Sequence, residues 1–69
     1  MYTIFEKQMK NVKTWFALTD AQIQDPASKI LFNNGVVKEI AKASTIREMR
    51  RLETETRIAY ISNGSIKYA

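Results

Sequence analysis

The 69-residue chain contains no cysteine and no histidine. The first absence excludes a disulfide framework, and the two together exclude the zinc sites that depend on sulfur and imidazole ligands. They also remove the usual general base near neutral pH and the strongest side-chain nucleophile. The four serines, Ser28, Ser44, Ser62 and Ser65, stand where cap or turn residues are expected. We therefore predict that the protein is not an enzyme and uses no cofactor and no metal.

Long apolar runs and glycine are also scarce. No apolar run approaches the roughly 18 residues that cross a bilayer, and the N-terminus lacks the layout of a secretory signal. We therefore expect a cytoplasmic protein with no integral membrane association. The two glycines, Gly35 and Gly64, each follow an asparagine, as in turns, so the chain has no glycine-rich phosphate-binding loop.

The residues that are present describe a small folded domain. Apolar residues make up 45% of the chain and charged residues 26%, which is the balance of a soluble globular protein rather than of a disordered tail. We interpret residues 1–69 as a single domain, since no repeat, linker or low-complexity tract interrupts them. A core this small needs unusually good packing or a second subunit, so a homodimer is one expectation.

Residues 4–16 place apolar side chains at helical spacing. These are Ile4, Phe5, Met9, Val12, Trp15 and Phe16, with charged residues on the opposite arc. The preferred prediction is a helix of about 14 residues capped by Thr3, with Glu6 in the capping-box position. The alternative is a hairpin of YTIFEKQ and VKTWFAL joined around Lys10 and Asn11, because these strands are rich in β-formers.

Further short helices are predicted in the middle of the chain. A polar start at Thr19 and Asp20 precedes a helix that begins at Pro26 behind an Asp25 cap and stops before Gly35. The Asn34-Gly35 pair is also a hairpin signal, which leaves this stretch open.

Two helices are predicted after Gly35. Residues 36–41 carry apolar side chains at i, i+1, i+4 and i+5, which suits one face of a short helix. Thr45 then caps a helix that runs to about Glu55, with Glu48 in the capping-box position. Its buried stripe is Ile46, Met49 and Leu52.

The C-terminal residues 57–69 predict a β-hairpin. Asn63-Gly64 is the dipeptide that adopts positive φ in a type I′ turn, and it is flanked by RIAYIS and SIKYA. The two-residue loop predicts that Ile61 faces Ile66 and that Ala59 faces Tyr68. A two-stranded ribbon is marginal alone, so we expect it to be extended by another strand or by a second subunit.

These elements predict a small single-domain α+β fold, with three or four short helices packed on a C-terminal two-stranded β-hairpin. Over residues 26–69 their order resembles the layout of a winged helix-turn-helix domain. The sequence departs from that family at Ser44, Thr45 and Arg51, where an apolar residue, a turn glycine and a core residue are common. The resemblance is therefore one of layout and implies no function.

Positive charge collects in the second half of the chain. The net charge is +4, and residues 36–69 hold seven basic and four acidic residues, a net +3. Guanidinium groups suit phosphates and guanine edges, and all four arginines lie within Arg47 to Arg57. We predict Arg47, Arg50 and Arg51 as the principal nucleic-acid contacts, with Lys42, Arg57 and Lys67 as peripheral phosphate contacts.

The same segment supports a second interpretation. Glu53 and Arg57, and likewise Arg51 and Glu55, are spaced to form ion pairs on a helix that merely faces solvent. The aromatic residues also have two interpretations. Trp15 and Tyr60 both fit a core. Alternatively, Tyr60 stacks on a base and residues 4–16 lie on a membrane surface.

We therefore hypothesise a small non-enzymatic binding protein, a nucleic-acid-binding regulator that binds DNA rather than RNA through a basic helix and a hairpin. The alternative is a protein-binding inhibitor or host-directed accessory factor. Such a protein would act through the edge of the ribbon or through the aromatic N-terminal segment.

Overall fold

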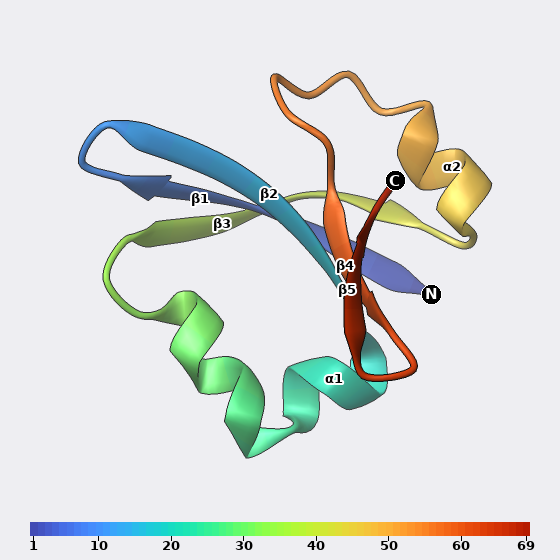
Figure 1. Cartoon of the computed structure of the whole chain (residues 1–69), viewed down its shortest axis with the longest axis horizontal. Helices are drawn as coiled ribbons and strands as arrows, with labels where there is room; N and C mark the ends of the chain where they lie inside the picture. The colour runs from blue at the N-terminus through green and yellow to red at the C-terminus, as the bar shows by residue number, and fades with distance from the viewer.

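The computed structural model describes all residues from Met1 to Ala69 and shows one five-stranded mixed sheet with strand order β3-β1-β2-β4-β5 (Figure 1). The strands are β1 (Tyr2–Met9), β2 (Val12–Thr19), β3 (Val36–Ala43), β4 (Ala59–Ser62) and β5 (Ser65–Tyr68). The helices are α1 (Asp20–Gln24), the 3₁₀ helix η1 (Pro26–Phe32) and α2 (Ile46–Arg50). The prediction of helices packed on a C-terminal hairpin is wrong, because the sheet dominates the fold and short helices lie on its two sides.

The N-terminal segment is a hairpin rather than a helix. β1 and β2 pair antiparallel around Lys10 and Asn11, with Ile4 opposite Ala17 and Phe5 opposite Phe16. Both strands lie inside the sheet, and where α2 and η1 cover its two faces, neighbouring residues such as Ile4 and Phe5, or Trp15 and Phe16, are both apolar. The strands therefore lack the alternation of apolar and polar residues that is typical of a half-exposed strand. The spacing of their apolar residues resembles that of a helix instead.

The core lies on both faces of the sheet. On one face Ile4, Trp15 and Ala17 pack with Met49 of α2 and with Ile58. Ile4 and Met49 are completely buried, so this face anchors α2. We call it the α2 face.

The other face carries a cluster of three phenylalanines. Phe5 stacks on Phe16 with ring centroids 5.3 Å apart, and Phe32 of η1 meets both rings edge-on at 5.2 and 5.9 Å. Such aromatic contacts add to the area that they bury. They hold η1 on this face, which we call the η1 face.

Residues 36–43 form an edge strand, so the short helix predicted there is wrong. β3 pairs with β1 so that Ile4 lies opposite Ala41 and Phe5 lies opposite Glu39. Ile40 is thus the extra residue of a β-bulge, which shifts the side-chain alternation by one position. The shift produces the i, i+1, i+4, i+5 spacing that resembles a helix.

The helix that begins behind Thr45 is shorter than predicted and ends at Arg50. Residues 52–58 instead follow an irregular path with bends, which brings Leu52 and Ile58 onto the core. Thr54 also donates a hydrogen bond from its hydroxyl to the carbonyl of Thr56, a local bond that competes with helix formation. Since a strand precedes α2, there is no helix-turn-helix, and the winged-helix layout is not formed.

The C-terminal hairpin is confirmed. Ala59 lies opposite Tyr68 and Ile61 lies opposite Ile66, while φ is 50° at Asn63 and 77° at Gly64. The expected extension by a further strand is also confirmed, because β4 pairs in parallel with β2 at Phe16 and Ala59. None of the helices has the length and apolar character needed to cross a membrane.

Candidate nucleic-acid interface

The short helix α2 is fixed at its start and along its buried side. The Thr45 hydroxyl accepts a hydrogen bond from the Glu48 N–H at 3.2 Å, as predicted for the cap. The Glu48 carboxylate accepts a hydrogen bond from the Ser44 N–H at 2.8 Å. Met49 is completely buried beneath the helix, which fixes the side of α2 that faces the sheet and leaves Arg47 and Arg50 exposed on the other side.

The three predicted arginines of this segment are exposed and have no acidic partner. The protein forms two ion pairs, Lys13 with Glu55 at 3.9 Å and Lys38 with Glu6 at 3.5 Å, and neither involves an arginine. The arginines in question are Arg47, Arg50 and Arg51. The predicted pairs between glutamates and arginines are absent because α2 ends at Arg50 and the i, i+4 neighbours separate.

Arg57 is held in place by the end of the chain. Its Nε donates to the Ala69 carbonyl at 3.2 Å, and its Nη2 donates to the Tyr68 carbonyl at 3.1 Å. A guanidinium has five N–H donors, so three remain for a ligand. Fixing the side chain in advance lowers the entropy that binding would cost.

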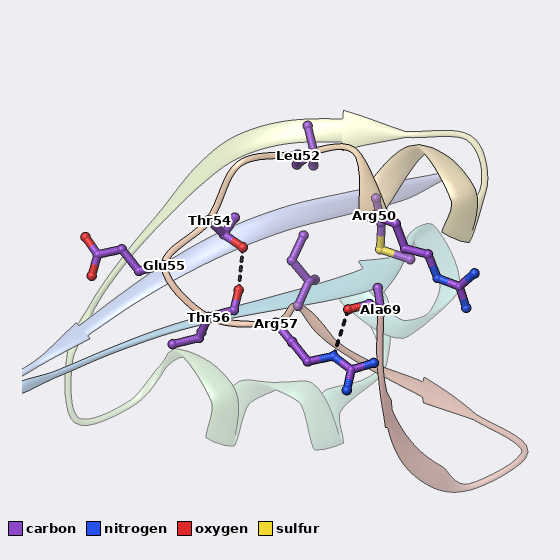
Figure 2. Close-up of a pocket in the computed structure, with 9 residues that line it drawn as sticks. Arg50, Leu52, Thr54, Glu55, Thr56, Arg57 and Ala69 are labelled. Carbon is purple, nitrogen blue, oxygen red and sulfur yellow. Dashed lines mark hydrogen bonds between the residues drawn. The ribbon is translucent and has the colours of Figure 1, made fainter.

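Arg50 and Arg57 line one cavity of about 300 Å³ between the end of α2 and residues 52–58 (Figure 2). We call it the arginine pocket. The hydroxyl-bearing Thr54 and Thr56 contribute to its wall, and Glu55 points away from both arginines (Figure 2). The Thr54 hydroxyl already donates to the Thr56 carbonyl, so the donors that the cavity presents are the two guanidinium groups and the Thr56 hydroxyl. Charged N–H donors of this kind suit a phosphate.

The two predicted lysines lie on different faces of the sheet. Lys67 is exposed on β5 opposite Tyr60, whose side chain belongs to the core of the α2 face. Lys42 is exposed on β3 opposite Thr3, which points to the η1 face. Alternation along the strands therefore places Lys67 on the same face as α2 and Lys42 on the other.

The sequence interpretation missed Tyr68 and Lys13. Both line a cleft of about 570 Å³ beside the first half of β2, and Arg57 lines it too. Tyr68 is 55% exposed, whereas Tyr60, the aromatic residue considered for stacking, is 8% exposed and part of the core. The exposure of Tyr68 could have been predicted from the hairpin register. The register places Tyr68 opposite Ala59, whose side chain is too small to cover the ring.

The six residues predicted as contacts therefore separate into two groups. One group lies on the α2 side of the sheet or at its border and comprises Arg47, Arg50, Arg51, Arg57 and Lys67, whereas Lys42 lies apart from it. Comparison with known proteins assigns no function to this arrangement: no protein-family model matches the chain, and no curated protein or solved structure is significantly similar to it.

Proposed function

We propose that the protein is a small non-enzymatic nucleic-acid-binding protein that contacts phosphates with the arginines of α2 and with Arg57. The observation that carries the proposal is that Arg47, Arg50 and Arg51 are exposed without a carboxylate partner. Because no carboxylate neutralises them, their guanidinium groups are available to phosphate oxygens. A net charge of +4 adds long-range attraction toward a polyanion.

The length of α2 indicates how such contacts would work. A helix of five residues spans about 7.5 Å, which is too short to read several base edges along a major groove. Phosphate contacts by arginine and lysine supply affinity without sequence information. We therefore infer that binding tolerates many sequences and weakens steeply with salt.

The proposal is tested by titrating a fluorescently labelled 20-nucleotide oligonucleotide at about 50 mM salt and following its anisotropy. We predict that replacing Arg47, Arg50 and Arg51 together by glutamine lowers the affinity about tenfold or more, because three phosphate contacts are lost.

The control variant removes the same charge elsewhere. Replacing Lys10, Lys29 and Lys42 by glutamine also lowers the net charge by three, but these exposed residues lie outside α2. It should lower the affinity by less than about threefold, because it weakens only long-range attraction. Equal losses in the two triple variants, or no binding by the native protein, would refute the proposed interface.

A second candidate function is protein binding through the outer ribbon. Ile66 is 68% exposed and Ile61 is 39% exposed on the η1 face, and both line a small cavity whose eight residues are all apolar. β5 also has an open edge. If the native protein binds no oligonucleotide in the titration, this apolar surface remains as the candidate binding site.

A further inference from the structure

We propose that the cleft beside β2 holds one unpaired nucleotide, so that the protein prefers single-stranded to double-stranded nucleic acid. The inference rests on the proposed function and adds to it a second contact of a different kind. The arginines of α2 bind backbone phosphates, whereas the cleft takes a base.

The cleft exists because the sheet is incomplete at this point. β4 starts at Ala59 and pairs with β2 at Phe16, so the outer edge of β2 from Val12 to Trp15 has no strand beside it. The resulting space has a volume of about 570 Å³, within the range of small-ligand sites. Its lining residues are Val12, Lys13, Thr14, Trp15, Thr56, Arg57, Ala59 and Tyr68.

The walls of the cleft offer the two kinds of contact that a base needs. Tyr68 and Val12 are more than half exposed, at 55% and 51%, so an aromatic ring and an aliphatic surface are available to the faces of a base. The unpaired edge of β2 presents backbone N–H and C=O groups. These groups suit the polar edge of a base, because buried backbone groups need hydrogen-bond partners.

Positive charge lies beside this apolar space. Lys13 and Arg57 both line the cleft, and Arg57 also lines the arginine pocket. Because Arg57 is shared, it can bind the phosphate that joins a nucleotide in the cleft to the next one near α2. The ion pair between Lys13 and Glu55 is weak, because the two charged atoms are 3.9 Å apart and the Glu55 side chain is 75% exposed. Lys13 can therefore also bind a phosphate.

These features favour a single strand for a physical reason. A base can stack on Tyr68 only if it has left its neighbours, and unstacking costs least when the strand is unpaired. Stacking on an aromatic side chain tolerates every base, because each has a π face. The cleft therefore gives selectivity for strandedness without selectivity for sequence.

Trp15 gives a direct measurement of occupation. It is the only tryptophan of the chain and it lines the cleft. We predict that a 12-nucleotide oligothymidylate changes the Trp15 fluorescence. A hairpin duplex, or an abasic oligonucleotide of the same length, should leave the emission unchanged even where it binds.

Variants on β5 separate stacking from folding. We expect Tyr68→Ala to weaken binding of the oligothymidylate about tenfold and Tyr68→Phe to retain it, because both tyrosine and phenylalanine provide a ring. Ile66→Ala is the matched control, since Ile66 is exposed on the same strand and face but does not line the cleft. It should bind as the native protein does.

The outcomes distinguish this inference from the proposed function. Equal affinity of Tyr68→Ala and the native protein, or the same Trp15 response to the abasic strand, would overturn the nucleotide site. The arginine interface would then still stand if the α2 triple variant loses binding. If the native protein binds no oligonucleotide at all, both proposals fail together.

Discussion

Arg57 connects the two parts of the proposed interface at the scale of single residues. Its side chain lines both the arginine pocket and the cleft beside β2, and two of its N–H groups are fixed on the Ala69 and Tyr68 carbonyls. The sequence predicted Arg57 as a peripheral phosphate contact. It did not predict the anchoring, because the acceptors lie 11 and 12 residues away along the chain.

Glu55 is the one acidic side chain among the residues that line the arginine pocket. It lines the arginine pocket and pairs with Lys13, so it opposes an incoming phosphate. We predict that Glu55→Gln tightens oligonucleotide binding about two- to fivefold at low salt, because it removes a like charge and frees Lys13. Titrations at about 50 mM and 300 mM salt check this, and the gain should shrink at the higher salt.

Glu39→Gln is the matched control for Glu55→Gln. Glu39 is exposed on β3 opposite Phe5, on the η1 face and away from the arginine pocket, and its replacement changes the net charge equally. Equal gains in affinity from the two substitutions would mean that only the total charge matters, and would argue against a local phosphate site.

At the scale of elements, the sequence predicts those features that depend on adjacent residues. The predicted caps Asp25 and Thr45 each accept a hydrogen bond from a backbone N–H of the helix that follows. The register of β4 and β5 is also as predicted, because the Asn63-Gly64 turn fixes it. Neither depends on distant parts of the chain.

The elements that the sequence mispredicts depend on distant contacts. β1 and β2 carry apolar residues on both faces where α2 and η1, from later in the chain, pack on them, and β3 loses its alternation at Ile40. α2 ends early because Leu52 and Ile58 must reach the core. The cleft that Tyr68 lines also depends on contacts between distant parts of the chain, so the spacing of residues in the sequence does not predict it.

The turn between β4 and β5 gives a test at this scale. A side chain at Gly64 meets open space, so the cost of Gly64→Ala comes only from its φ of 77°. We predict a loss of about 1 to 2 kcal/mol in the free energy of unfolding, measured with urea. Gly64→Asn should lose less, since asparagine tolerates positive φ. Equal losses would mean that the turn lacks this conformation.

At the scale of the whole molecule, a thin sheet leaves little core and much surface. The principal extents are 30, 28 and 19 Å, and ten of the 69 residues are buried. Stability of roughly 3 to 5 kcal/mol is expected for a core of this size. Because β4 is short and pairs with β2 only at Phe16, the edge of β2 from Val12 to Trp15 stays open for a ligand.

The salt dependence of binding tests the central claim that the arginines meet phosphate. Affinity for a labelled single strand is measured between about 50 and 300 mM salt, for the native protein and for the variant with Arg47, Arg50 and Arg51 replaced by glutamine. Four arginine contacts, including Arg57, predict a slope of log K against log salt near −3, and the variant should give about −1. A native slope near zero, or the same slope in both proteins, would contradict the account.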